Sequence, residues 1–229
     1  TVNKHVEWLG TFWSHAVASS TPPSDFKLQI TAWQHHFAAL FGEKELRRVK
    51  GFSLPEMHLP NHPDALYKLL TALKECGYQW VMVQEHSVEN LDGSHLRDEQ
   101  KYIPNILKAQ SSNGDIISIL TLIKTQGSDT KLVGQMQPYY AALDLSRHNM
   151  GTCTIPTLVS QIADGENGGV MMNEFPQAFL QAYRKIGPKT NESRTIAING
   201  SEYLDFLKTL NVDEDSYPEI QAVHQHKIW

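Results

Sequence analysis

The chain has 229 residues, of which 41% are hydrophobic and 20% charged, and its formal net charge is −5. This is the composition of an ordinary globular protein, which excludes collagen, coiled coil and extended disorder. The acidic balance, with no basic block, argues against nucleic acid or an anionic membrane surface as a partner.

Two cysteines, Cys76 and Cys153, are too few for a disulfide framework, so we expect a reducing, cytoplasmic location. No apolar run approaches the roughly 18 residues that a membrane-spanning helix needs. The first residues lack both an initiator Met and a signal-peptide core. We therefore expect the chain to be a fragment of a longer protein.

Apolar segments of strand and helix type alternate along the chain, which is typical of an α/β class with parallel strands. The expected strands span 9–19, 49–54, 78–84, 158–163 and 195–198, and a hairpin joins 102–110 to 115–124. The expected helices span 26–41, 62–76 (capped by Asn61), part of 129–143, 175–186 and 200–210 (capped by Asn199). Residues 1–229 read as one domain, with an irregular tail over 211–229.

The first segment that could carry chemistry is Gly51–His58, in which an apolar strand ends in a carboxylate. Pro55 stiffens the backbone directly before Glu56. In α/β barrels the carboxyl ends of the strands face the active site, so Glu56 is a candidate catalytic group. An exposed glutamate that only caps the next helix gives the same pattern.

The second segment follows the expected strand 158–163, where Asp164 and Glu166 lie among three glycines within five residues. Glycines leave room for a ligand to approach the backbone. A tight acidic turn is the simpler interpretation of this loop alone. Two carboxylates at the ends of two strands can, however, converge across a cleft, as glycoside hydrolysis requires.

Taken in order, these segments resemble glycoside hydrolase family 57, the amylolytic α-glucan-active family, in a cyanobacterial-type branch. Gly-Phe-Ser-Leu-Pro-Glu (51–56) is similar to the family segment Gly-Phe-Trp-Leu-Pro-Glu, and 164–169 is similar to its Asp-x-Glu-x-Phe-Gly loop. The resemblance implies that Glu56 is the nucleophile and Asp164 the acid/base of retaining cleavage or transfer of α-glucan bonds, without a cofactor or a metal. It covers roughly residues 8–210, including Trp-Ser-His-Ala (13–16) and Ser-Glu-Tyr-Leu (201–204).

The same resemblance implies a distorted (β/α)7 barrel. The family's opening His-x-Pro strand motif is absent, so we expect the barrel to be incomplete at its N-terminal end. A missing N-terminal segment or self-association would complete it, and the fragment itself could be inactive. Ser53 and Gly168 replace aromatic residues of the family motifs, which leaves the particular glucan open.

Further residues are expected to bind the oligo- or polysaccharide substrate. Trp13 lies at a strand end and is suited to stacking on a pyranose face. His15, His58 and His86 are placed to bind sugar hydroxyl groups, although His15 and His86 could equally be core histidines. Glu166 would support Asp164 or bind a hydroxyl group.

Two alternatives remain open from the sequence. A metal-dependent polysaccharide deacetylase would use His58, His62 and an Asp as ligands, because the two histidines have i, i+4 spacing. Pro60 and the Asn61 cap argue against one helix turn holding both. A catalytically inert carbohydrate-binding barrel is the other alternative.

Overall fold

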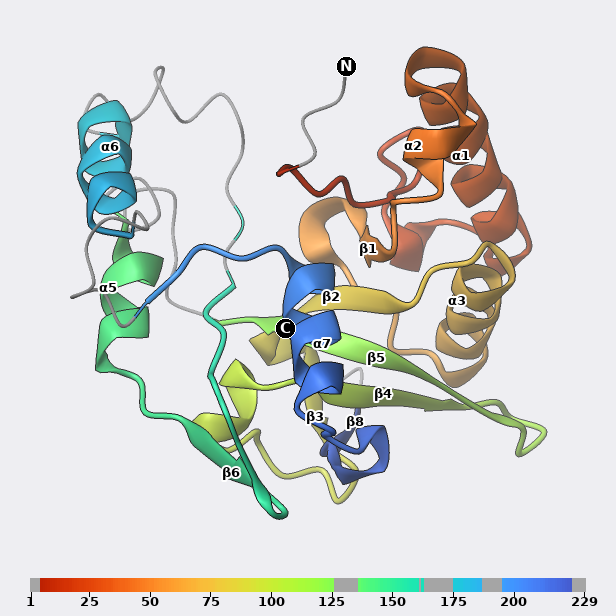
Figure 1. Cartoon of the computed structure of the whole chain (residues 1–229). Helices are drawn as coiled ribbons and strands as arrows, with labels where there is room; N and C mark the ends of the chain where they lie inside the picture. The colour runs from red at the N-terminus through yellow and green to blue at the C-terminus, as the bar shows by residue number, and fades with distance from the viewer. Residues whose placement is uncertain (1–4, 126–135, 161, 163–174, 187–194, 224–229) are drawn as a thin grey trace.

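The computed structural model describes residues 5–125, 136–160, 162, 175–186 and 195–223 (Figure 1). The strands are β1 (Gly51–Ser53), β2 (Trp80–Gln84), β3 (Val88–Asn90), β4 (Asn105–Gln110), β5 (Ile116–Lys124), β6 (His148–Met150), β7 (Cys153–Ile155) and β8 (Glu219–Ala222). The α-helices are α1 (Phe26–Phe41), α2 (Glu43–Leu46), α3 (Pro63–Glu75), α5 (Gln137–Asp144), α6 (Phe175–Ile186) and α7 (Gly200–Thr209). Short 3-10 turns include η3 (Pro55–Met57), η4 (Glu85–Ser87) and η5 (Glu99–Tyr102). None of the helices in these ranges is long and apolar enough to cross a membrane.

The central sheet has six strands in the order β1-β2-β5-β4-β8-β3. Its first three strands are parallel, and single parallel bridges extend this part to Gly10 beside β1 and to Ser160 beside the end of β5. We call this series, from Gly10 through β1, β2 and β5 to Ser160, the parallel arc. The carboxyl ends of its strands therefore meet at one edge of the sheet.

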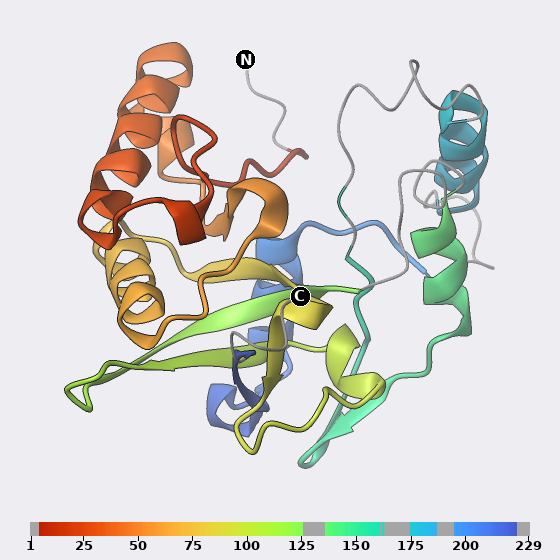
Figure 2. The ribbon, with the colours of Figure 1, turned by 180° about the vertical axis from the view of Figure 1, so that it is seen from behind.

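Helices cover both faces of the sheet. Helices α1 and α3 pack on one face, and α7 packs on the other, while α5 and α6 lie on the opposite side of the molecule from α1 (Figures 1 and 2). Along β2 the side chains alternate between the two cores, with Val81 and Val83 facing α1 and α3, and Trp80 and Met82 facing α7. This alternation is the period-2 geometry of a strand, and it explains why β2 reads as a continuous apolar run.

The Trp80 side chain, the largest in the α7 core, fits only because two of its neighbours are glycines. A Cβ atom at Gly51 would lie 2.2 Å from the Trp80 ring, and one at Gly200 would lie 2.6 Å from it. The Trp80 indole Nε1 donates a hydrogen bond to Ser201 Oγ at 3.0 Å. Strand β2 and the start of α7 are thereby fixed to each other.

The coarser part of the fold expectation is confirmed. The described residues form a mixed α/β fold with a largely parallel six-stranded sheet, and the distorted (β/α)7 barrel stays a prediction. The face opposite α1 and α3, which would line the inside of a barrel, is filled by α7 and forms a second core. The sheet is nevertheless strongly bent, because only the three residues of η4 separate β2 from β3 at the far end of the strand order.

The secondary structure confirms the strongest local signals. The hairpin of β4 and β5 forms as expected, with Gly114 in its turn at φ 90°. Helix α7 begins with the expected capping box of Asn199 and Glu202. Helix α3 begins one residue later than expected, because His62 and not Asn61 is its N-cap.

Three strand predictions were wrong. Residues 195–198 are irregular, and the segments 9–19 and 158–163 contribute only the bridges at Gly10 and Ser160 among their described residues. The tail was expected to be irregular, yet β8 pairs with both β3 and β4, and Ile220 in it is fully buried. A four-residue strand carries too little alternation to be recognised, and its neighbours supply the backbone partners that make it a strand.

The α7 core provides a stability test. Leu207 is completely buried, so Leu207→Ala should lower the free energy of unfolding by about 2–5 kcal/mol. The neighbouring Phe206 is 43% exposed, and Phe206→Ala is the matched control with an expected effect below about 1 kcal/mol. Urea denaturation of both variants measures this, and equal effects would contradict the assignment of the core.

Candidate active site

The first element of the site is the segment that follows Gly10. Backbone hydrogen bonds run from Gly10 N to Gly51 O and from Ser53 N to Gly10 O, each 2.9 Å, and hold the segment parallel to β1. The chain then turns at His15, whose φ of 54° lies in the left-handed region. This pairing brings residues after Gly10 to the same edge as the residues after β1.

The second element is Glu56, which follows β1 as the sequence predicts. Glu56 and Met57 have φ values of 55° and 53°, so two consecutive residues other than glycine occupy the left-handed region. Such a backbone costs about 1–3 kcal/mol per residue and persists only where the surroundings hold it. Here Pro55 and Met57 are buried on either side, while the Glu56 side chain is 66% exposed. The two buried neighbours thus force the carboxylate outward.

His15 and Glu56 meet directly. The distance from His15 Nε2 to Glu56 Oε1 is 2.8 Å, although 41 residues separate the two along the chain. Both side chains are mostly exposed, so the contact adds little stability in high dielectric. Its effect is to orient the carboxylate at the edge of the sheet.

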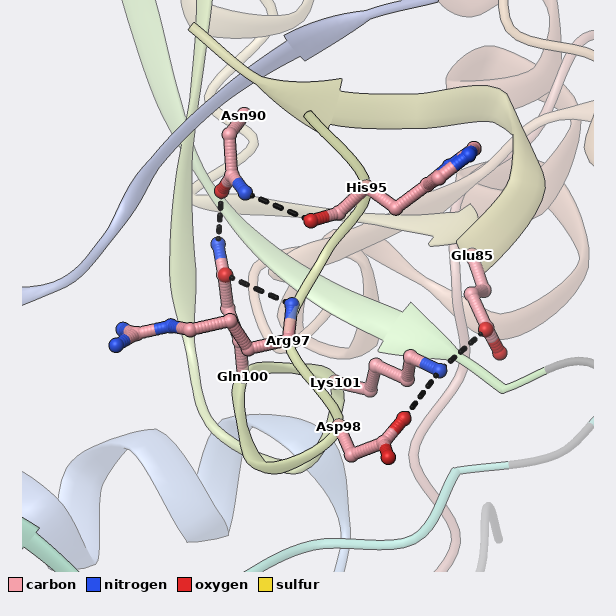
Figure 3. A network of polar contacts seen from close by, with 7 residues as sticks. All are labelled: Glu85, Asn90, His95, Arg97, Asp98, Gln100 and Lys101. Atoms are coloured by element: carbon pink, nitrogen blue, oxygen red, sulfur yellow. Dashed lines mark hydrogen bonds and ion pairs between the residues drawn. The ribbon is translucent and has the colours of Figure 1, made fainter. Parts of the chain in front are cut away.

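Strand β2 of the parallel arc is also followed by a carboxylate. Glu85 follows β2 directly, and its Oε1 atom lies 2.7 Å from Lys101 Nζ. Lys101 also contacts Asp98 Oδ1 at 3.0 Å (Figure 3). His86, which we expected to bind substrate, is exposed next to Glu85. The sequence analysis missed the roles of Glu85 and Lys101, although Glu85 follows its strand much as Glu56 follows β1.

A buried polar network positions Lys101. Gln100 is 1% exposed and its amide donates to Asn90 Oδ1 at 2.9 Å and to Asn105 Oδ1 at 3.0 Å. Asn105, which is fully buried, donates to the carbonyl oxygens of Gln100 and Ile103. Figure 3 shows Gln100 joined to Asn90 and to the backbone of Arg97, with Lys101, the next residue, directed toward Glu85. Fully satisfied networks of this kind define one geometry.

Strand β5 of the parallel arc ends in a lysine. Lys124 is 8% exposed at the end of β5, in register with Gln84 of β2 and bridged to Ser160. It lies on the same side of the sheet as Leu120 and Leu122, the α7 side. Burial lowers the pKa of Lys124, and the nearby negative charge of Glu85 only partly opposes this. Within the described part of the chain Lys124 forms no ion pair. A buried strand that runs straight into a lysine was the sequence signal for it.

The other predicted site residues are distributed unevenly. Trp13 is 48% exposed and contacts the His36 ring of α1, with ring centroids 4.4 Å apart. His58 is half-buried two residues beyond Glu56. Asp164 and Glu166 lie outside the described residues. The structure therefore places His15 in contact with Glu56. The proximity of Glu56 and Asp164 stays a prediction.

The described residues contain no group of three His, Cys, Asp or Glu side chains that could hold a metal ion. His58 follows η3, whereas His62 is the N-cap of α3, so the two do not share a helix turn. The described part of the chain thus gives the deacetylase alternative no support.

The fold and the site together define a mixed α/β class with ionisable side chains along the carboxyl edge of a parallel arc. No protein-family model matches the sequence, and no curated protein matches it significantly. Among solved structures, the fold is similar to that of the 4-alpha-glucanotransferase from Thermococcus litoralis, with a TM-score of 0.57 and 18% sequence identity. The likeness covers 87% of this chain and 26% of that chain, so this chain spans about a quarter of the length of that protein. At this identity the likeness shows the fold alone.

Replacing Lys124 and replacing Lys101 should change the free energy of unfolding in opposite directions. Lys124→Met removes a buried charge and should raise the free energy of unfolding at pH 7 by about 1 kcal/mol. The folded protein releases the Lys124 proton below pH 10.5, the value of the unfolded chain, so wild-type stability rises with pH in that window. The advantage of the variant should therefore shrink as the pH rises, as measured by urea denaturation between pH 7 and 10.

Lys101→Met is the matched control. Partial burial acts to lower the pKa of Lys101, but the hydrogen bonds and charges of Glu85 and Asp98 outweigh it and raise the pKa overall. Its positive charge therefore stabilises the fold, and the variant should lose roughly 0.5–1 kcal/mol at pH 7. A Lys124→Met variant that is destabilised like the control would contradict the description of Lys124 as a buried, poorly compensated charge.

Proposed function

We propose that this chain carries the nucleophile-bearing part of an α-glucan-active enzyme, a retaining glycoside hydrolase or glucanotransferase. The observation that carries the proposal is the contact of His15 with Glu56 at the carboxyl edge of the parallel arc. The resemblance of residues 51–56 to glycoside hydrolase family 57 supports it from the sequence. The similar fold of a 4-alpha-glucanotransferase supports it from the structure.

In the proposed reaction the Glu56 carboxylate attacks the anomeric carbon of the sugar and forms a covalent glycosyl ester. The bond from that carbon to the glycosidic oxygen breaks, and the departing oxygen takes a proton from Asp164. Water or the hydroxyl group of a second glucan then attacks the same anomeric carbon, and the bond from that carbon to the Glu56 oxygen breaks and frees the carboxylate. Asp164 takes up the proton of the attacking group. Hydrolysis and transfer differ only in this acceptor.

His15 has a positioning role in this scheme. A ring N–H of His15 that donates to Glu56 Oε1 leaves Oε2 to attack. The exposure of both side chains provides access for a polymer. Trp13, His58, His86 and Glu166 would contact the sugar rings on either side of the cleaved bond. The retaining mechanism requires the carboxyl groups of Glu56 and Asp164 to lie about 5–5.5 Å apart.

Replacement of the nucleophile tests the proposal. Glu56→Gln, made in the chain or in a longer protein that contains it, should lower turnover of maltodextrin by about three orders of magnitude or more. Glu56→Ala should recover activity when azide is added and release a glycosyl azide, because the small anion replaces the missing carboxylate. Glucose release and product mass measure both effects.

Glu75→Gln is the control, because Glu75 is half-exposed and pairs with Lys27 near the end of α3. It should retain full activity. A Glu56→Gln variant that keeps most of its turnover, or a Glu56→Ala variant that azide leaves inactive in an otherwise active protein, would refute the role of Glu56.

A further inference from the structure

A pocket lies at the opposite edge of the sheet from Glu56. Its lining includes Glu7 and Trp8, which precede Gly10, and Arg48, which precedes β1. Asn199 and Ser201 at the start of α7 complete this wall, and Ser201 contacts Trp80, the first residue of β2. These residues lie at the amino ends of the strands, whereas His15 and Glu56 lie at the carboxyl ends. We call this the amino-edge pocket; it is a hollow of about 120 Å³ that opens to solvent.

One carboxylate oxygen in this pocket lacks a partner. Glu7 Oε2 accepts a hydrogen bond from Ser201 N at 3.1 Å and so caps α7. Glu7 Oε1 is buried, yet no donor from the described residues reaches it. An unsatisfied buried carboxylate oxygen costs about 1–3 kcal/mol or more. A ligand group that donates a hydrogen bond to this oxygen, once the Glu7 side chain turns it toward the pocket, would remove the cost.

The charges of the pocket restrict that ligand. Glu45 and Glu202 also line it, and the guanidinium of Arg48 contacts the Glu45 carboxylate. Three carboxylates against one guanidinium repel an anion. Among the described residues no His, Cys, Asp and Glu set is arranged to hold a metal ion. The lining is therefore rich in acceptors and suits a ligand that brings its own hydrogen-bond donors.

The pocket also has an aromatic wall. Trp8 is 42% exposed, and its ring is held by Phe41, stacked at 5.5 Å, and by Phe37, edge-on at 5.8 Å. A ring fixed by packing loses little entropy on binding and offers an apolar face. Apolar faces and hydroxyl edges occur together in a pyranose ring. We propose that the amino-edge pocket is a second sugar-binding site that takes a hexopyranose unit of a neutral glucan.

The choice of a glucan as ligand rests on the proposed function, but the pocket itself does not involve Glu56. Bound there, a glucan chain would be held to the protein at a distance from the reacting bond. Such a site adds to the affinity for a polymer through effective concentration, without taking part in the reaction.

Titration of the isotope-labelled chain with maltotriose, followed by amide NMR, tests this site. The amide signals of Glu7, Trp8 and Ser201 and the indole signal of Trp8 should shift together with a millimolar dissociation constant. Glu7→Gln retains an acceptor for Ser201 N but places an amide donor in the site, so it should weaken this binding by about tenfold or more. Trp8→Ala should weaken it as strongly.

Trp13→Ala is the matched control, because Trp13 is equally exposed but lies at the carboxyl edge. It should leave the shifts at Glu7, Trp8 and Ser201 unchanged. The amide spectrum of each variant reports whether it folds, and the wild-type shifts decide the matter should Trp8→Ala unfold. The proposal is overturned if maltotriose leaves these signals in place, or if spermidine moves them and maltotriose does not. Loss of turnover in Glu56→Gln with intact shifts at Trp8 separates this site from the proposed function.

Discussion

The backbone pairing of the parallel arc is the constraint on which the site depends. Hydrogen bonds from Gly10 to β1, and parallel pairing of β1, β2 and β5, bring the carboxyl ends of these strands to one edge. Glu56, Glu85 and Lys124 then need only to stand at or just after the end of a strand. The contact between His15 and Glu56 results from this arrangement and not from attraction between two exposed side chains.

The same edge carries a stability cost. Glu56 and Met57 hold a strained backbone, and Lys124 is buried without an ion pair among the described residues. The buried network of Gln100 and Asn105 supplies rigid support next to these features. Natural sites commonly concentrate strain and charge where a ligand is to be bound, and the surrounding core offsets them.

The two edges of the sheet have different chemistry. The carboxyl edge combines carboxylates with lysines and exposes Glu56 to solvent, which suits a reaction on a bound polymer. The amino edge combines Glu7 with an exposed indole face and an excess of acceptors, which suits binding alone. Helix α7 connects the two functions structurally, because its first turn is capped by Glu7 and fixed to Trp80 of β2. The two proposed sites would therefore lie at opposite edges of one small sheet.

The sequence alone determined the α/β class, the helices other than α2, the β4–β5 hairpin and the position of Glu56 after a strand, because caps, turn residues and periodicity act over a few neighbouring positions. It did not determine β8, the irregular segment 195–198 or the strand order of the sheet, because a strand depends on which distant backbone lies beside it. Trp80 illustrates the limit: its apolar strand is evident from sequence, but Gly51 and Gly200, which make room for its ring, meet only in the folded chain. Likewise His15 and Glu56, or Glu85 and Lys124, are joined by strand pairing across about forty residues, and only tertiary structure decides such pairing.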